Sequence, residues 1–315
     1  MSKLNSTKEP GGPKMTRLSD PQKQTGYPVV GFPMQFTWQT GDWVRIFDAQ
    51  VKQIQEDIAR ARSEDRLIIY LSCPISSRGG GLSLTNVDIA SFTARRIMNE
   101  WGSRFWVLNP SAYQLESKQG TGLIHRLAEE VRISEKRLAH LKAKFPPKDG
   151  DYMRMWTKVL VEDDDGQNLG GRFAAYYFLG PNDVRHFFDI NQTTTLTAAV
   201  EEYFARQYTI NQDFHAFFSE PFCDSSGKPI PKKQWPALWH RRRLEFFRFY
   251  SLRGSAGYSK GSHDEWNIFV TLNKLRLEAS EGKGYGLGSQ IAGYFAGSQI
   301  PPGASECTVA HGYEV

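Results

Sequence analysis

The chain alternates between short apolar runs and longer stretches in which apolar residues recur every three or four positions. Two of the runs, residues 67–71 and 105–108, are bounded by turn residues and predict buried strands. Between them, residues 86–101 have helical spacing, and Gly102 is expected to end that helix. This succession predicts a βαβ unit with parallel strands and a right-handed crossover.

The same patterns predict the remaining elements. Helices are expected at residues 42–63, 123–144, 151–161, 193–208, 235–252 and 262–279, and a third strand at residues 173–179. The predicted fold class is α/β, with a doubly wound, mostly parallel sheet of the Rossmann or flavodoxin-like kind and a helical C-terminal extension. We expect a flexible N-terminal arm (residues 1–31), an α/β domain (32–210) and a helical, loop-rich extension packed on it (211–315).

Composition narrows the class of protein. Of the 315 residues, 40% are hydrophobic and 23% charged, which is typical of a globular protein. The net charge of +5 suits a small anionic ligand and does not by itself indicate nucleic acid, which we do not expect as a partner. Three scattered cysteines predict neither a disulfide framework nor a zinc site. With no apolar leader or membrane-length apolar run, we expect a cytoplasmic protein and no membrane contact.

A glycine-rich loop follows the first predicted strand. It contains Ser76, Ser77 and Arg78 and then three glycines, beginning with Gly79 and Gly80. Backbone N–H groups in such a loop can bind an anion, and an arginine can contact a phosphate through two hydrogen bonds. The sequence matches neither GxxxxGK[ST] nor GxGxxG, so a solvent-exposed glycine turn is an equally good interpretation.

Three segments occur in an order known from one enzyme superfamily. Residues 69–75 read IYLSCPI, a second strand ends at Asn109-Pro110, and a third ends in LGPND at residues 179–183, before a helix containing TAAVEEYFA at 197–205. Over residues 67–206 the chain resembles the nucleoside 2-deoxyribosyltransferase-like superfamily, which includes nucleoside deoxyribosyltransferases and nucleoside 5′-monophosphate N-glycosidases. Cys73 stands where that superfamily has glycine.

The resemblance implies a function and a set of site residues. The expected reaction is cleavage or transfer of the N-glycosidic bond of a nucleoside or nucleoside 5′-monophosphate, with no metal or cofactor. Glu201 would be the carboxylate nucleophile, Tyr70 would orient it, and Asp183 would face the base or ribose. The expected substrate-binding residues are Ser72, Ser76, Ser77, Arg78, Gly79, Gly80 and Asn182, the glycine loop holding the 5′-phosphate.

Other interpretations remain open at this stage. Glu201 and Glu202 are adjacent on a predicted helix and are also typical of a solvated helix face. The same carboxylate chemistry would serve an NAD glycohydrolase, and a nucleotide-binding sensor without turnover would need only the fold. The acidic run at residues 162–165 suggests a solvated loop or a metal site. None of the seven histidines is assigned a role.

Two segments near the C-terminal end have unusual composition. Residues 239–250 combine arginines with aromatic residues, which predicts a helix packed on the core, a surface for an anionic partner, or a contact in a homo-oligomer that completes a neighbour's site. Residues 262–266 read SHDEW, which invites a catalytic interpretation. The S-x-x-E pattern of a capping box explains them, so we expect Ser262 and Glu265 to cap a helix.

Overall fold

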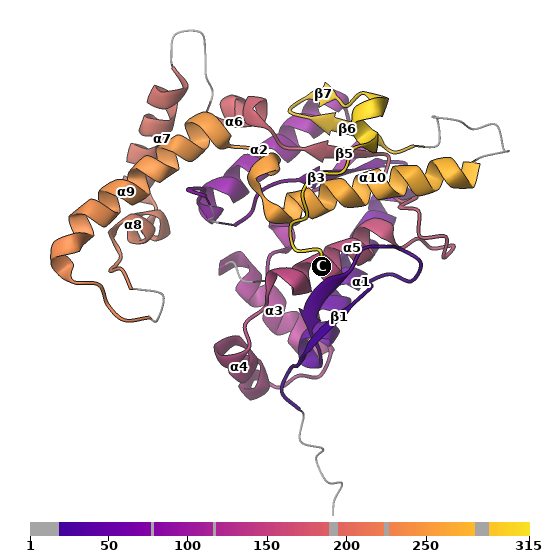
Figure 1. Cartoon of the computed structure of the whole chain (residues 1–315), viewed down its shortest axis with the longest axis horizontal. Helices are drawn as coiled ribbons and strands as arrows, with labels where there is room; N and C mark the ends of the chain where they lie inside the picture. Colours follow the sequence, from indigo (N-terminus) through magenta and orange to yellow (C-terminus); the bar gives the residue numbers. More distant parts are fainter. Residues whose placement is uncertain (1–18, 77–78, 116–117, 189–194, 224–226, 281–289) are drawn as a thin grey trace, which may run out of the picture.

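A five-stranded, mostly parallel sheet forms the centre of the computed structural model, which describes residues 19–315 except 77–78, 116–117, 189–194, 224–226 and 281–289 (Figure 1). The strand order is β4-β3-β5-β6-β7. All neighbouring pairs are parallel except β6 with β7. The strands are β3 (Leu67–Ser72), β4 (Phe105–Leu108), β5 (Ala175–Phe178), β6 (Ala292–Phe295) and β7 (Ser298–Gln299). The predicted parallel βαβ unit is confirmed.

Helices flank this sheet, so the mixed α/β class is also confirmed. None of the helices in the described ranges is long and apolar enough to cross a membrane. The helices are α1 (Asp42–Ser63), α2 (Ser83–Trp101), α3 (Lys118–Glu130), α4 (Glu135–Lys144), α5 (Asp149–Val161), α6 (Pro181–Phe187), α7 (Leu196–Ile210), α8 (Gln212–Ser219), α9 (Trp235–Arg248) and α10 (Lys260–Ser280).

The sheet divides the protein into two cores, and the interior strand β3 contributes to both because successive side chains of a strand point to opposite faces. Ile68 and Tyr70 lie in one core, with apolar side chains of α1, α5 and α10. Ile69 and Leu71 lie in the other, with side chains of α2, α6, α7 and α9. A residue on α7 is therefore separated from Tyr70 by the thickness of the sheet.

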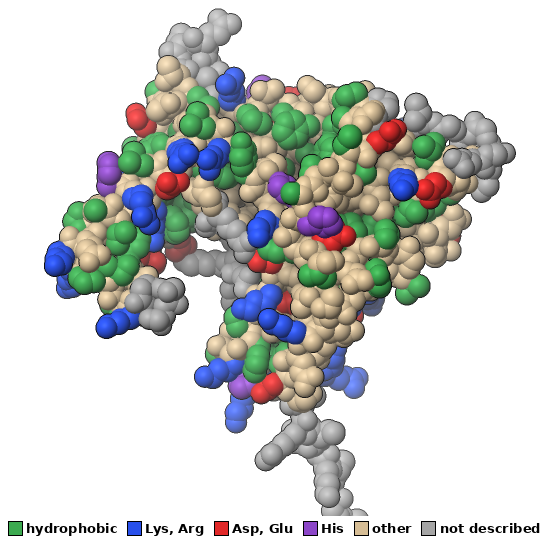
Figure 2. Space-filling view, in the orientation of Figure 1, with side chains coloured by type: hydrophobic (Ala, Val, Ile, Leu, Met, Phe, Trp, Pro, Cys, Tyr) green, Lys and Arg blue, Asp and Glu red, His purple; other side chains and the backbone are tan. Residues whose placement is uncertain are grey.

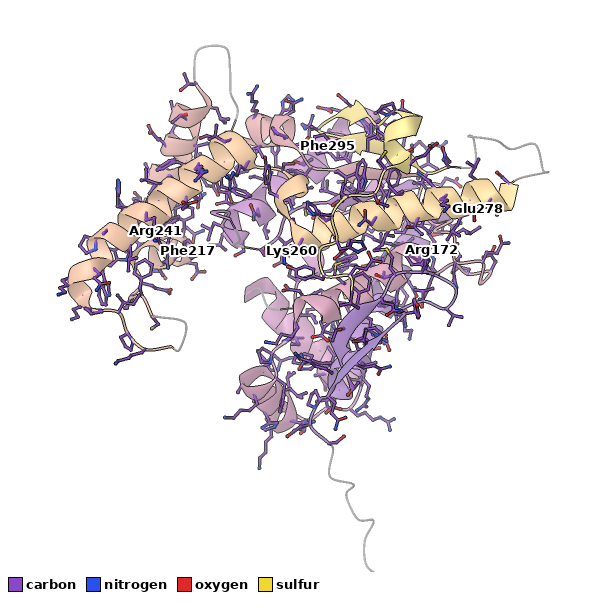
Figure 3. The ribbon with its side chains drawn as sticks, in the orientation of Figure 1. Arg172, Phe217, Arg241, Lys260, Glu278 and Phe295 are labelled. Atoms are coloured by element: carbon purple, nitrogen blue, oxygen red, sulfur yellow. The ribbon has the colours of Figure 1, made fainter. Side chains whose placement is uncertain are left out.

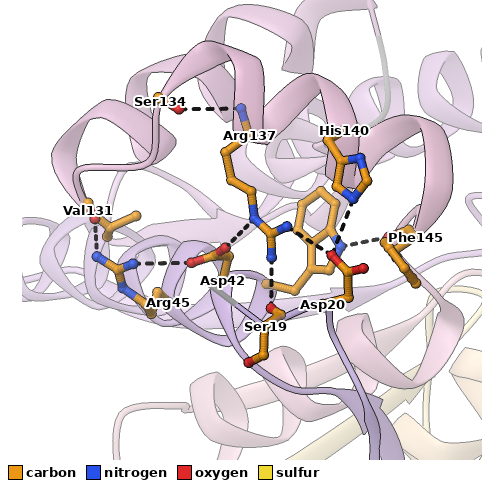
Figure 4. A network of polar contacts seen from close by, with 10 residues as sticks. Ser19, Asp20, Asp42, Arg45, Val131, Ser134, Arg137, His140 and Phe145 are labelled. Carbon is orange, nitrogen blue, oxygen red and sulfur yellow. Dashed lines mark hydrogen bonds and ion pairs between the residues drawn. The ribbon is translucent and has the colours of Figure 1, made fainter. Parts of the chain in front are cut away.

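The single helix predicted for residues 123–144 is two helices, α3 and α4. The chain turns between them at Arg132, whose φ is 57°, and Ser134 caps α4 by accepting a hydrogen bond from the Arg137 backbone N–H. Figure 4 shows what the break achieves: the Arg137 guanidinium pairs with Asp42 of α1 at 2.8 Å and with Asp20 at 3.0 Å. A continuous helix would not bring Arg137 to these carboxylates.

Both predicted domain boundaries are corrected by the strands. Residues 23–26 of the expected flexible arm form β1 (Lys23–Gly26), which pairs with β2 (Phe36–Gln39). The expected extension supplies β6 and β7 to the central sheet, and β6 pairs directly with β5. Residue 210 therefore does not separate the sheet from an extension.

Helices α7, α8 and α9 form a helical arm beside the sheet (Figure 1). Their aromatic side chains pack together, with ring centroids 4.8 Å apart for Phe204 and Phe218 and 5.4 Å apart for Phe204 and Phe246. The aromatic face of α9 thus packs inward, as the core-packing interpretation predicts. Its opposite face exposes Arg241 and Arg248, and basic side chains are spread over the surface of the arm (Figures 2 and 3).

Candidate functional site

A buried carboxyl group lies at the carboxyl end of β3, an interior strand of the sheet. Ser72, the last residue of β3, donates a hydrogen bond from its Oγ to Oε2 of Glu265 on α10, at 2.5 Å. Ser72 is fully buried, and Glu265 is 6% exposed. The two residues are 193 positions apart in the sequence. The carboxyl ends of parallel strands are where α/β proteins bind ligands, so this pair occupies a favourable position for a site.

Tyr70 lies beside the same carboxyl group. Its side chain is fully buried, and its hydroxyl makes no well-formed hydrogen bond in the described part of the chain. Burial, reinforced by the neighbouring Glu265, raises the pKa of Tyr70 well above its ordinary value of 10. The phenol therefore stays protonated and keeps a hydrogen that it can donate to the carboxyl. A carboxyl group therefore lies near Tyr70, but it belongs to Glu265 and not to Glu201.

The environment of Glu265 strongly favours its neutral form. Burial raises the pKa of Glu265 from its ordinary value of 4.5 to about 8, while the hydroxyls of Ser72 and Tyr70 lower it and the charge of Asp264 raises it. Desolvation disfavours a charge, whereas donated hydrogen bonds stabilise one. A carboxyl group that titrates near neutrality is suited to proton transfer or to nucleophilic attack.

The capping box predicted at Ser262 is wrong. Helix α10 already begins at Lys260, so Ser262 lies inside it, and the Glu265 carboxyl binds Ser72 instead of a backbone N–H. The adjacent Asp264 points elsewhere and accepts hydrogen bonds from the backbone N–H groups of Gly312 and Tyr313, at 2.8 and 2.7 Å. These bonds hold residues 312–313 against the first turns of α10.

A cavity of about 490 Å³ adjoins this carboxyl site. Trp266, the neighbour of Glu265, and Ser262, one helical turn earlier, both line it. So does Phe178, which is paired in the sheet with Ser72. The rest of its wall comes from His263 of α10, from residues 256–257, and from β6, β7 and the segment after them, including Phe295 and Ile300. Ser72, Phe178 and Phe295 are the last residues of three adjacent parallel strands, so the site and the cavity share one edge of the sheet.

The structure does not bring Glu201 to Tyr70. Glu201 is exposed on α7, and the buried residues of that helix, including Val200 and Tyr203, belong to the core on the other face of the sheet. Its assignment as the nucleophile oriented by Tyr70 is therefore corrected. The pattern of two adjacent glutamates on an amphipathic helix marks a solvated face here.

Asp183 is also placed differently from the expectation. It is fully buried, and its carboxylate accepts hydrogen bonds from the Tyr177 hydroxyl at 2.6 Å, from Arg96 at 2.6 Å and from the Gly180 N–H at 2.8 Å. Tyr177 lies in the core opposite Tyr70. With its oxygens occupied on that side, Asp183 caps α6 and does not face Glu265. Asn182 is exposed and donates to the Ala296 carbonyl at 3.4 Å.

The described part of the glycine loop is held by α9 and α2. Ser77 and Arg78 lie outside the described residues, and Ser76 and Gly79 are exposed. The Ser76 carbonyl accepts a hydrogen bond from Asn86 of α2 at 3.0 Å. Gly80 has φ of 99°, and a β-carbon there would overlap the carbonyl oxygen of Glu245 on α9. The helical arm therefore fixes one side of the loop, which explains part of its glycine content.

The acidic run at residues 162–165 closes a loop. The Asp163 carboxylate accepts hydrogen bonds from the backbone N–H groups of Leu169 and Gly171, both at 2.7 Å, and Asp164 pairs with Arg172. No group of three or more metal-ligating side chains occurs in the described ranges. The solvated-loop interpretation accounts for these carboxylates.

Comparison of the chain with protein-family models, with curated proteins and with solved structures finds no match.

Proposed function

We propose that this protein cleaves or transfers the N-glycosidic bond of a nucleoside or nucleoside 5′-monophosphate, with Glu265 as its carboxylate. The observation that carries the proposal is the buried Glu265 carboxyl, bound by Ser72 and adjacent to Tyr70 at the carboxyl end of β3. The superfamily that residues 67–206 resemble requires a first-strand tyrosine beside a carboxylate nucleophile. Glu265 meets that requirement in space. We further infer that the sheet is of the doubly wound class, since a core covers each face.

The proposed chemistry uses the ionised form of Glu265. Its carboxylate attacks C1′ of the sugar, the C1′–N bond breaks, and the bonding electron pair leaves with the base, which takes a proton from solvent. Water or another acceptor then attacks C1′, loses a proton and releases the carboxylate. Ser72 donates a hydrogen bond to one carboxylate oxygen, and Tyr70 is the positioning residue beside it.

The proposed role of Glu265 can be tested by substitution, with the exposed Glu201 as a matched control. Wild type, E265Q and E201Q are incubated with a panel of nucleosides, nucleoside 5′-monophosphates and NAD, and released base is measured by chromatography. We expect E265Q to lose at least about a thousandfold in rate, because removal of a nucleophile leaves only binding and positioning. E201Q, with an equivalent change on an exposed helix face, should keep wild-type activity. Full activity of E265Q would refute the assignment, as would equal losses in the two variants.

A second candidate function is a nucleotide-binding module without turnover. The observation that favours it is the burial of the carboxyl site: Ser72 is fully buried and Glu265 is 6% exposed, which leaves little surface of the carboxyl accessible to a substrate. Calorimetric titration of the same panel separates the two proposals. Nucleotide binding by wild type and E265Q alike, with no base released by either, would select the module. Release of nicotinamide from NAD alone would select an NAD glycohydrolase.

A further inference from the structure

We propose that the cavity between α10 and the β6–β7 hairpin is a binding site for a neutral, planar aromatic heterocycle, with Ser262 as its polar contact. The cavity is lined by Phe178, Trp266 and Phe295, by the aliphatic side chains of Ile300 and Val309, and by Ser262. Calling this heterocycle the leaving base of the substrate rests on the proposed function. The existence of the binding site does not.

The size and walls of the cavity fit a flat aromatic ring. About 490 Å³ lies within the range of small-molecule sites. The rings of Phe178 and Trp266 pack against each other with centroids 4.9 Å apart, and together they form an aromatic wall. Phe295, which also lines the cavity, is 39% exposed, so part of this large apolar ring is open to solvent. A stacked heterocycle would bury this apolar surface.

Ser262 supplies the second, independent observation. It is 3% exposed, and its hydroxyl has no hydrogen-bond partner among the described residues. A buried hydroxyl without a partner is unfavourable, and such groups are rare unless a ligand or water satisfies them. A ring nitrogen or exocyclic group of a heterocycle would provide the missing partner.

The electrostatics of the cavity exclude charged ligands. No lysine, arginine, aspartate or glutamate is among its described lining residues. The titratable side chain that does line it, His263, donates a hydrogen bond from its Nε2 to the Gly257 carbonyl at 2.8 Å. A phosphate or carboxylate would enter without a counter-charge, which is costly in an apolar site. A neutral base meets no such penalty.

The position of the cavity connects it to the carboxyl site. Ser262 precedes Glu265 by one helical turn, and Phe178 is the sheet partner of Ser72, which binds Glu265. A heterocycle in the cavity would thus lie at the same edge of the sheet as the carboxylate proposed to attack C1′. Part of the wall comes from residues 298–309, which lie outside the segment that resembles the superfamily.

The experiment is calorimetric titration of the full chain with free adenine, uracil and nicotinamide as probes. E265Q is titrated beside wild type, because binding to the cavity should not need the ionised carboxylate. Ser262→Ala should weaken binding of the preferred base about three- to tenfold, the value of one neutral hydrogen bond. Ala304→Trp, which places a large ring at an exposed lining position, should abolish it.

Ser111→Ala is the matched control. Ser111 is also buried with an unpartnered hydroxyl, but it follows β4 and does not line the cavity, so this variant should bind like wild type. No binding of any probe to wild type, or equal binding to wild type and Ala304→Trp, would overturn the inference. If E265Q binds a base as wild type does but also releases base at the wild-type rate, the proposed function fails and the cavity assignment stands.

Discussion

Replacing Glu265 by glutamine should change how the stability of this protein depends on pH. Glutamine has nearly the same shape, can still accept the Ser72 hydrogen bond, and is neutral at every pH. In the unfolded wild type the Glu265 carboxyl ionises near its ordinary pKa of 4.5, whereas in the folded protein burial raises that pKa to about 8. Below pH 4.5 the carboxyl is neutral in both states, so wild type and E265Q should be about equally stable.

The size of the effect follows from this shift. As pH rises from 4.5 to 8, the unfolded chain loses a proton that the folded protein keeps, so wild type loses stability relative to E265Q by about 1.4 kcal/mol per pH unit. The difference should level off above pH 8 at about 5 kcal/mol in favour of E265Q. Such a cost at one residue is typical of a site kept for function.

Urea unfolding of wild type and E265Q at pH 5 to 9, followed by tryptophan fluorescence, measures this difference directly. E278Q is the control: Glu278 is exposed near the other end of α10, so the same substitution there should leave the pH dependence of wild type unchanged (Figure 3). A free-energy difference between wild type and E265Q that is constant with pH, or that shrinks as pH rises, would refute the argument.

Three further outcomes are expected. Base release by wild type should rise about tenfold per pH unit between pH 6 and 8, as Glu265 ionises, and a falling rate would instead mark Glu265 as a proton donor. Asp183→Asn should lower the free energy of unfolding by about 3 kcal/mol, because it breaks the buried ion pair with Arg96, and the rate of base release per folded molecule should not change. Lost activity at normal stability would instead support a catalytic role for Asp183. Gly80→Ala should lower the unfolding midpoint in urea more than Gly79→Ala, since only at Gly80 would the added carbon meet the Glu245 carbonyl, and equal losses would contradict that contact.

The fold was predictable wherever local pattern determines structure. The apolar runs that became β3, β4 and β5 are short, mostly apolar and bounded by turns, so their composition and length identify them. β6 was missed because a glycine interrupts its apolar run, AGYF at Ala292–Phe295, and the surrounding sequence is rich in glycine and serine. The break between α3 and α4 was missed because the apolar residues keep helical spacing across it. The ion pairs that Arg137 makes with Asp20 and Asp42 are far apart in the sequence, so the spacing of apolar residues cannot reveal them.

The site was predictable only in part. Tyr70 and Ser72 follow from the strand and from the resemblance, but the carboxylate that meets them comes from a helix 193 positions away from Ser72. Glu265 was not predicted as a site residue because the local S-x-x-E pattern already assigned it to a capping box. One signal could have corrected it: residues 268–272 are apolar on several sides of the helix, so α10 had to be buried, and Glu265 with it.

The separation of Ser72 from Glu265 has a consequence for the synthesis of this protein. A ribosome adds about 5 to 20 residues per second, so Tyr70 and Ser72 emerge roughly 10 to 40 seconds before the glutamate that completes the site. For about the first half of that time, until β5 has been made, the edge of β3 that later receives β5 is unpaired, which favours aggregation and makes a chaperone useful to the nascent chain. A product of premature termination before residue 265 would contain both hydroxyl groups but no carboxylate. Such fragments could not catalyse the proposed reaction, so activity would report nearly full-length synthesis.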